Sequence, residues 1–162
     1  MERPKISIVM GSQSDLGTVQ EAINILKEFK VGFEVKVLSA HRTPKELADY
    51  VSSAPKRGVL IFIAAAGGAA ALAGTIASHT ILPVIGIPIE TSSLKGLDSL
   101  LSTVQMPKGV PVATMAIGNP GAANAAIFAL GILALTDKRI QRMLLLFRNR
   151  MRQKIRKTKI SF

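Results

Sequence analysis

The 162-residue sequence predicts an α/β fold, a three-layer flavodoxin-like sandwich in which helices cover both faces of a parallel sheet. Short apolar runs, typical of strands buried on both faces, alternate along the chain with segments whose apolar residues recur every three or four positions. Such strand–helix units imply parallel strands joined by right-handed crossovers. Because the length is close to the roughly 150 residues expected of one domain, we expect one α/β domain, residues 1–136, followed by a basic amphipathic C-terminal helix, residues 137–162.

The first half of the chain opens with an almost wholly apolar run at Ile6–Met10, which predicts a buried strand. One face of a helix is then formed by Leu16, Val19, Ala22, Ile23 and Leu26. The alternation at Phe33–Leu38 predicts a second strand. Thr43–Glu46 matches a capping box with proline at the first helical position, so a second helix is expected to begin there.

The second half continues the same alternation. Val59–Ala65 is rich in Val and Ile and predicts a third buried strand, and a helix rich in Gly and Ala is expected after Gly68. The remaining elements are strands at Val84–Ile87 and Val112–Ile117 and helices at Leu94–Val104 and Ala122–Leu135.

The composition excludes several kinds of site. The chain has no cysteine and two histidines, which argues against disulfides, thiolate zinc sites, iron–sulfur clusters, thiol catalysis and histidine-rich metal sites. Aromatic residues make up 4% of the chain, so the side chains on which single-stranded nucleic acid stacks are scarce.

The formal net charge of +11 belongs to the C-terminal segment. Residues 137–162 hold ten Lys or Arg and one acid, a net +9, whereas the other 136 residues hold 11 bases and nine acids, a net +2. This segment also carries an apolar stripe at helical spacing, formed by Ile140, Met143, Leu144, Phe147, Met151 and Ile155. The stripe predicts a helix that packs on the body or on a neighbouring subunit, and contact with nucleic acid or an anionic membrane is the alternative.

Two stretches without a charged residue, Gly58–Ile89 and Gly109–Thr136, are each longer than the roughly 20 residues that span a bilayer. Glycines and prolines interrupt both, including an expected turn at Gly118–Gly121, and much of the remainder is Ala and Gly, which gain little from insertion. We therefore expect no membrane span. The N-terminal residues lack the apolar core and cleavage site of a signal peptide, which indicates a cytoplasmic protein.

Polar segments follow the first three predicted strands, at Gly11–Asp15, Ser39–Pro44 and Ala66–Ala69. In an open parallel sheet, ligands bind beyond the carboxyl ends of the strands, where the helices begin. We expect the three segments to converge on one edge of the sheet.

The first polar segment, Gly-Ser-Gln-Ser-Asp, suits an anion, because serine hydroxyls and free N–H groups at a helix start bind phosphate. The same residues also make an ordinary cap of a helix N-terminus. The segment lacks the Gly-Lys-Ser/Thr of a Walker loop and the glycine pattern of a dinucleotide fold, so ATP and NAD are not indicated.

The second polar segment holds His41, and its neighbour Arg42 can bind phosphate through two N–H groups. A histidine gains and loses a proton near neutral pH, so His41 is a candidate general acid/base. A structural role in the loop before the helix is the alternative. His79, in a Ser-His-Thr stretch at an expected helix end, is interpreted as structural.

Gly67 and Gly68 allow the main chain to approach a ligand closely, and they are equally compatible with a tight strand-to-helix turn. Lys95–Ser99 and Gln105–Pro107 supply further polar groups, but their spacing alone assigns them no role.

Five segments share one order and spacing with a known family. They are G-S-Q-S-D, S-A-H-R-T-P, A-A-G-G-A-A, L-K-G-L-D-S-L-L-S-T-V-Q-M-P-K-G-V-P-V-A-T and A-I-G-N-P-G-A-A-N-A-A. Over about residues 5–135 the chain closely resembles the class I N5-carboxyaminoimidazole ribonucleotide mutases of purine biosynthesis, the PurE family.

The resemblance implies a flavodoxin-like subunit in a homo-octamer that uses no metal and no organic cofactor. It implies conversion of N5-carboxyaminoimidazole ribonucleotide (N5-CAIR) to 4-carboxyaminoimidazole ribonucleotide (CAIR) on the route to IMP. A carboxylate moves from the exocyclic nitrogen to ring carbon 4 by decarboxylation and recarboxylation. The partner is then a small ribonucleotide, with no membrane and no nucleic acid expected.

The functional residues of the family map onto this chain motif by motif. His41 is expected to be the general acid/base. The residues expected to bind the substrate are Ser12, Ser14, Asp15, Ser39, Arg42, Gly67, Gly68, Ala69 and Leu72. Among these, Arg42 and the first two serines are expected near the phosphate, and the group from Gly67 to Leu72, with Ser39, around carbon dioxide and the imidazole.

The chain departs from the family at one motif. Where the family has His-Leu-Pro-Gly-Met, this chain has Ala71-Leu-Ala-Gly-Thr75, so Ala71 replaces a histidine at the pocket mouth. Two alternative functions stay open at this point. One is the related aminoimidazole ribonucleotide (AIR) carboxylase, which uses free carbon dioxide. The other is a weakly active nucleotide-binding protein whose basic tail contacts nucleic acid.

Overall fold

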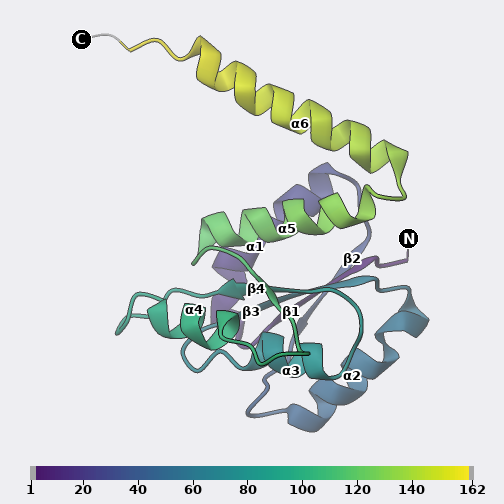
Figure 1. Ribbon diagram of the computed structural model, residues 1–162, viewed down its shortest axis with the longest axis vertical. Helices are drawn as coiled ribbons and strands as arrows, with labels where there is room; N and C mark the ends of the chain where they lie inside the picture. Colours follow the sequence, from purple (N-terminus) through teal and green to yellow (C-terminus); the bar gives the residue numbers. More distant parts are fainter. Residues whose placement is uncertain (1–2, 161–162) are drawn as a thin grey trace. The chain divides into compact units, whose positions relative to one another are not determined.

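Five parallel strands form the sheet in the computed structural model, which describes residues 3–160 (Figure 1). They are β1 (Ile6–Met10), β2 (Phe33–Val37), β3 (Ile61–Ala66), β4 (Val84–Pro88) and β5 (Ala113–Thr114). Their order across the sheet is β2-β1-β3-β4-β5. Because this is the order of flavodoxin-like doubly wound folds, the predicted fold class is confirmed.

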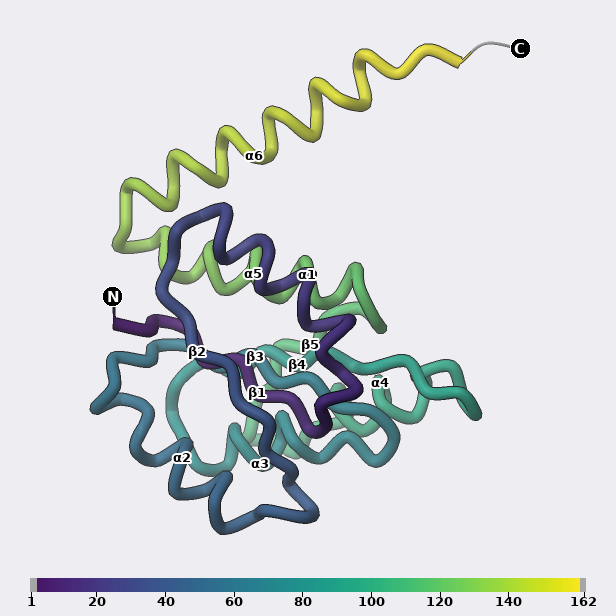
Figure 2. Tube along the Cα trace, turned by 180° about the vertical axis from the view of Figure 1, so that it is seen from behind, coloured from purple at the N-terminus to yellow at the C-terminus, as the bar shows by residue number. Residues whose placement is uncertain are grey.

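Helices cover both faces of the sheet. They are α1 (Leu16–Glu28), preceded by the short 3-10 helix η1 (Gln13–Asp15), α2 (Pro44–Arg57), α3 (Leu72–Ser78), α4 (Leu97–Val104) and α5 (Asn119–Leu133). Figure 1 shows α1 and the first part of α5 on one face and α2, α3 and α4 on the other. Figure 2 shows the same two layers from behind.

The core lies between the sheet and these two layers. β1 and β3 are buried along their whole length, and successive side chains point to opposite faces. Val9 packs into a cluster with Leu47 of α2 and Ile76 of α3. Ile8 and Ile63 alternate along β1 and β3 with the residues of that cluster, so they point to the opposite face of the sheet, and they have no exposed surface. Burial on both faces is why these strands are continuous apolar runs in the sequence.

Several elements differ from their predicted ranges. β5 spans only Ala113–Thr114 of the expected Val112–Ile117, and α4 begins at Leu97. The turn expected at Gly118–Gly121 is wrong, because α5 already begins at Asn119. Proline fits the first turn of a helix, and at Gly121 an added Cβ would fall on the carbonyl oxygen of Ala116.

The second helix, α2, begins at Pro44 as predicted, but its capping box is absent. The Thr43 hydroxyl makes no cap bond. Its Oγ1 atom donates to the Ser39 carbonyl at 3.1 Å and accepts from the Ser39 N–H at 2.9 Å. The capping-box prediction at Thr43–Glu46 is therefore wrong, since the hydroxyl closes the loop that precedes the helix instead.

A polar network fixes α2 to the sheet. Arg57 donates to Glu34 of β2 at 2.9 Å, and its guanidinium lies 4.3 Å over the ring of Tyr50. The Tyr50 hydroxyl donates to Glu34 and shares a 2.7 Å hydrogen bond with the buried Ser7 of β1. The network therefore holds α2, and the loop before it, beside β1 and β2.

The network also sets the pKa of its members. Burial by itself raises the pKa of Glu34, but hydrogen bonds from Arg57 and Tyr50, together with the Arg57 charge, outweigh it and lower that pKa. Burial and the neighbouring Glu34 raise the pKa of Tyr50 to about 12. Near neutral pH the network thus pairs an ionised carboxylate with a neutral phenol.

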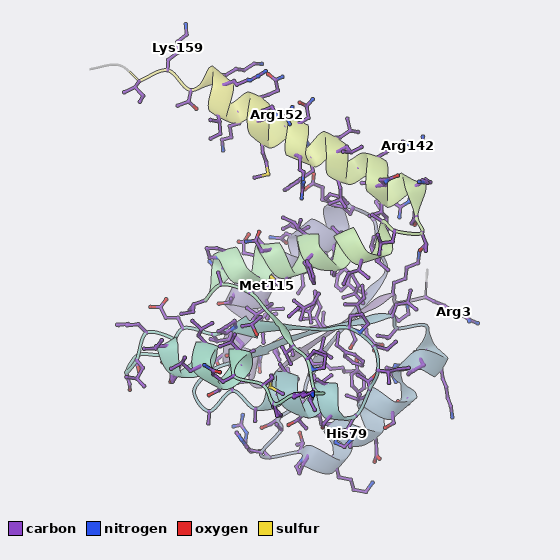
Figure 3. All side chains as sticks on the ribbon, in the orientation of Figure 1. Arg3, His79, Met115, Arg142, Arg152 and Lys159 are labelled. Atoms are coloured by element: carbon purple, nitrogen blue, oxygen red, sulfur yellow. The ribbon has the colours of Figure 1, made fainter. Side chains whose placement is uncertain are left out.

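The chain divides into two compact units, residues 1–127 and 128–162. The second contains α6 (Lys138–Lys157), whose first N–H groups, from Arg139 and Ile140, donate to the Asp137 carboxylate at 2.9 and 3.2 Å. Exposed cations such as Arg142 and Arg152 project from α6 (Figure 3). A C-terminal helix is present, whereas the boundary between residues 136 and 137 stays a prediction. Residues 1–2 and 161–162 of the two expected segments lie outside the described residues.

The two uncharged stretches are part of the α/β fold. The first, Gly58–Ile89, supplies β3, α3 and β4, and the second, Gly109–Thr136, supplies β5 and α5. Among residues 3–160, no helix combines the length and apolarity that crossing a membrane requires.

Replacement of Glu34 should show what the network contributes. Glu34→Gln is expected to lower the free energy of unfolding by about 1–3 kcal/mol near neutral pH, because hydrogen bonds to a charged group are weakened. A carboxyl whose pKa is lowered by folding stabilises the fold above its unfolded-state pKa, and loses that contribution as pH falls through its folded-state value. Urea unfolding at about pH 7 and about pH 3 should therefore show a difference between variant and wild type that shrinks in acid.

The control is Glu21→Gln, at an exposed position of α1. It should change the stability little at either pH. A Glu34→Gln deficit that stays constant between the two conditions would show that the carboxylate charge is not what the network uses.

Candidate active site at the carboxyl ends of the strands

A pocket of about 430 Å³ lies where the polar segments after β1, β2 and β3 meet. The convergence expected from parallel topology is therefore present. Of the ten residues predicted for the site, nine line the pocket: Ser12, Ser14, Asp15, Ser39, His41, Arg42, Gly67, Ala69 and Leu72. Gly68 is the exception.

The segment after β1 is a closed hydrogen-bonded group. The Ser12 N–H donates to the Asp15 carboxylate at 3.2 Å, and Ser12 Oγ accepts from the Ser14 N–H at 3.3 Å and from the Ser14 hydroxyl at 2.8 Å. These bonds make the capping box of η1. The capping role that the sequence allowed is correct, and the same three side chains also line the pocket.

Asp15 is buried at the pocket wall. Burial raises the pKa of this carboxyl, while hydrogen bonds from Ser14 and Ser12 and the charge of Arg42 act in the opposite direction. An ionised carboxylate in such a place accepts strong hydrogen bonds from ligand hydroxyls.

Arg42 connects the loops after β1 and β2. Its Nη2 atom donates to the Gly11 carbonyl at 3.0 Å, and its main-chain N–H donates to Ser39 Oγ at 3.2 Å. The Gly11 N–H in turn donates to the Ala65 carbonyl at 3.0 Å. The guanidinium is thus oriented by the Gly11 carbonyl and, through Nε at 3.4 Å, by the Ser39 hydroxyl. Its planar donor set suits a phosphate or carboxylate.

His41 is exposed and lines the pocket between Ala40 and Arg42. Its loop is closed by the reciprocal bonds between Ser39 and Thr43. His79, labelled in Figure 3, is the C-cap of α3. It is not among the pocket-lining residues. The structure therefore separates the two histidines as the sequence interpretation did.

The Gly67–Gly68 turn combines both roles considered for it. Gly67 lines the pocket and would bring an added Cβ to 3.5 Å from Ile89. Gly68 has a φ of +68°, a left-handed conformation that glycine adopts without strain. Its N–H donates to the Ser99 hydroxyl at 2.9 Å. Gly68 thus shapes the turn from outside the pocket.

The loop after β4 was missed by the sequence analysis. Ile89, Glu90 and Thr91 line the pocket, and the Thr91 hydroxyl donates to the Asp98 carboxylate at 2.8 Å. The sequence did carry a signal for this loop, because Glu90 and Thr91 are polar and follow closely after the strand Val84–Pro88. The fourth strand of a parallel sheet ends at the same edge as the first three.

Small apolar groups complete the wall. The further lining residues that the sequence analysis did not assign are Gly11, Ala40, Ala66, Ala70 and Ala71. Ala71 places a methyl group at the position where the resembled family has a histidine, which leaves His41 as the histidine among the described pocket-lining residues. Among residues 3–160, no three His, Asp or Glu side chains gather to hold a metal ion.

The pocket therefore has two chemically different parts. Ser12, Ser14, Asp15 and Arg42 offer hydroxyls, a carboxylate and a guanidinium, whereas the segment from Ala66 to Leu72 offers main chain and small apolar side chains. His41 adds a group that can carry a proton. Such a pocket suits a ligand with an anionic, hydroxylated end and a flat, less polar end.

Comparison with known proteins gives one consistent match. The family model described as AIR carboxylase matches residues 5–154. The N5-carboxyaminoimidazole ribonucleotide mutase of Vibrio parahaemolyticus is 54% identical over 145 residues, 90% of each chain. The protein of that name from Saccharolobus solfataricus is 50% identical over 157 residues, 97% of this chain and 98% of the relative.

Solved structures agree with the sequence relatives. The crystal structure of Treponema denticola PurE matches with a TM-score of 0.84 and 29% identity, over 94% of each chain. The crystal structure of a substituted PurE2 from the same organism matches with a TM-score of 0.86 and 27% identity, over 95% of this chain and 94% of that one.

Proposed function

The chain belongs to the AIR carboxylase family, and we propose that the pocket at the carboxyl ends of its strands is the active site of an N5-carboxyaminoimidazole ribonucleotide mutase. The reaction converts N5-CAIR to CAIR, an isomerisation in purine biosynthesis. The observation that carries the proposal is an identity of 50–54% to mutases over nine-tenths or more of this chain. The rival interpretation, a carboxylase that uses free carbon dioxide, is not favoured because these relatives are named as mutases.

The polar part of the pocket would hold the ribose phosphate. Arg42 would bind the phosphate together with the Ser12 and Ser14 hydroxyls, and Asp15 would accept hydrogen bonds from the ribose hydroxyls. The support for this assignment is that all four side chains line one pocket. The bond from Arg42 to the Gly11 carbonyl also orients the guanidinium before any ligand binds.

His41 would act as general acid/base at carbon 4. The bond between the exocyclic nitrogen and the carboxyl carbon breaks, its electron pair stays on the nitrogen, and His41 gives a proton to carbon 4. His41 then takes this proton back, so that the electron pair between carbons 4 and 5 can form a bond to the carbon dioxide that has been released. The hydrogen that carbon 4 carried from the start leaves as a proton and the exocyclic nitrogen gains one, which restores the aromatic ring in CAIR. Exposure of His41 to the pocket and its place beside Arg42 support this role.

The apolar part of the pocket would hold the imidazole and carbon dioxide. Gly67, Ala69 and Leu72 line the pocket beside Ser39 and offer no strongly solvated group. Such a wall excludes water and keeps a small neutral molecule near the ring.

The assembly we propose is a homo-octamer that acts without a metal or organic cofactor. The side chains of Met151 and Ile155 on α6 are 56% and 76% exposed in the single chain, and contacts between subunits would cover them. We place the protein in the cytoplasm, because its substrate and product are ribonucleotide phosphates, whose charge keeps them from crossing a membrane.

Turnover of the purified protein on N5-CAIR tests the function directly. A mutase retains the carbon dioxide that it releases, so turnover in labelled bicarbonate should yield mostly unlabelled CAIR at a rate indifferent to bicarbonate. Product that carries the solvent label in full would favour the carboxylase. So would activity only on aminoimidazole ribonucleotide with bicarbonate.

Replacement of His41 tests the general acid/base. His41→Asn should lower kcat more than tenfold, since general acid/base catalysis is worth roughly 100-fold or more. The dissociation constant for CAIR should change little, because the ring supplies proton transfer and little ground-state affinity. His79→Asn, at the C-cap of α3, is the control and should keep its activity. Near-normal turnover in His41→Asn would discard the proposed mechanism.

Replacement of Arg42 tests the phosphate assignment. A charge-assisted hydrogen bond is worth roughly 1.5–3 kcal/mol, so Arg42→Ala should raise the dissociation constant for CAIR about tenfold or more. Ser12→Ala should have a smaller effect of the same sign. Lys45→Ala removes a nearby cation that pairs with Asp49 and does not line the pocket, so it serves as the control. Isothermal titration with an unchanged constant for Arg42→Ala would contradict the assignment.

Removal of the chain after Thr136 tests the role of α6. All pocket-lining residues precede this point, so the site residues are kept, and the octamer should break into smaller species because the apolar stripe of α6 is gone. Sedimentation analysis of both forms gives the answer. If instead the full chain binds duplex DNA tightly at physiological salt and the shortened chain does not, α6 is a nucleic-acid contact and the packing interpretation is wrong.

A further inference from the structure

One buried hydroxyl joins two loops that line the pocket. Ser99, in the first turn of α4, has no exposed surface. Its Oγ atom donates to the Ile89 carbonyl at 2.7 Å and accepts from the Gly68 N–H at 2.9 Å. Ser99 itself is not among the pocket-lining residues, so it acts through the main chain of its two partners.

One of those partners, Ile89, lines the pocket, and the other, Gly68, directly follows the pocket-lining Gly67. The loops after β3 and β4 are joined at their base, where the Ile89 N–H donates to the Ala66 carbonyl at 2.9 Å. Ser99 adds a second connection farther along the first loop, at Gly68. Gly67, between the two connections, lies against Ile89 and Thr91 and faces the pocket. Without the Ser99 hydroxyl, the Gly67–Gly68 turn would keep the connection at its base and a long bond, 3.4 Å, from the Ser102 hydroxyl to the Gly68 carbonyl.

We propose that Ser99 is a positioning residue of the mutase, which holds the Gly67–Gly68 turn against Ile89 so that carbon dioxide released from the substrate stays in the pocket. The inference rests on the proposed function and assigns a role within it to a residue outside the pocket. In the sequence, the spacing of Lys95–Ser99 alone assigned this segment no role.

The chemistry of the reaction makes this closure matter. The carbon–nitrogen bond breaks with its electron pair left on nitrogen, and the same carbon dioxide molecule then bonds to carbon 4. Carbon 4 loses one proton and the nitrogen gains one, so no co-reactant enters. Carbon dioxide carries no charge and no hydrogen-bond donor. Enclosure, more than any single contact, must therefore retain it. A turn that opens more often lets it exchange with dissolved carbon dioxide before the new bond forms.

A purely structural role for the hydroxyl predicts a different result. Ser99→Ala leaves the Gly68 N–H and the Ile89 carbonyl without the partner that they have in the wild type, which destabilises a protein whatever its function. Loss of stability reduces the amount of active protein. It does not change how much solvent label each product molecule carries. The label carried per product molecule therefore separates positioning from stability.

The experiment measures label per product molecule and steady-state kinetics in octameric protein of full length. The wild type and Ser99→Ala turn over unlabelled N5-CAIR in labelled bicarbonate. For Ser99→Ala we expect the label per product to rise at least about threefold and kcat to fall about fivefold or more, with KM changed less than about twofold because the phosphate contacts are untouched.

Thr103→Val is the matched control. Thr103 is buried on the same helix, and its hydroxyl donates to the Ser99 carbonyl at 2.7 Å, within α4. The variant removes a buried hydroxyl without removing either bond to the pocket loops, so it should lose stability and keep the wild-type label per product. Should Ser99→Ala fail to fold, Ser99→Cys replaces it, since a thiol is only somewhat larger than a hydroxyl, leaves no cavity and donates only weakly. An intermediate rise in label is expected for Ser99→Cys.

The outcomes separate the two proposals. The role of Ser99 is overturned if the wild type turns over normally and the folded Ser99 variant carries the same label per product molecule. That result does not affect the proposed mutase function. The same rise in Thr103→Val as in Ser99→Ala also overturns it. A wild type that does not turn over N5-CAIR, or that incorporates the solvent label in full, overturns the proposed function itself.

Discussion

Parallel pairing of the strands is the constraint on which the rest of the molecule depends. All four pairings in the sheet are parallel, so every strand delivers its carboxyl end to the same edge, and every chain segment that leaves a strand begins there. For this reason one pocket is lined by residues from four widely separated segments, Gly11–Asp15, Ser39–Arg42, Ala66–Leu72 and Ile89–Thr91, although Gln13 and Gly68 within them do not line it. Burial of β1 and β3 on both faces keeps that edge in place.

The loops at this edge are ordered by hydrogen bonds between one loop and the next. Arg42 donates to the main chain after β1, and Ser99 joins the main chain after β3 to that after β4. The pocket wall is polar beside the first connection, at Ser12 and Asp15, and apolar beside the second, near Gly67. Preorganisation of this kind favours a reaction in which a small fragment must leave one atom and rejoin another without diffusing away.

The functional site could be predicted in part because its residues belong to short local motifs. Ser12 and Asp15 form their capping box within four residues, and His41 and Arg42 are neighbours in one loop, so their chemistry is readable in the sequence. Glu90 was missed although its position after the fourth strand was a readable signal. The contacts of Ser99 could not be predicted, because they depend on which loop lies next to which.

The sequence by itself determined the fold class, the order of the elements and the residues at the first three strand ends. Apolar runs and helical spacing are local patterns, and two-sided burial imposes them directly on the chain. Only the tertiary structure decided where β5 and α5 begin and end, and where the Thr43 hydroxyl is used. It also decided that Gly68 shapes the turn from outside the pocket, bound to Ser99. Each of these features depends on a partner distant in sequence or on a competing hydrogen bond. Such dependences produce no periodic pattern of residues in the sequence.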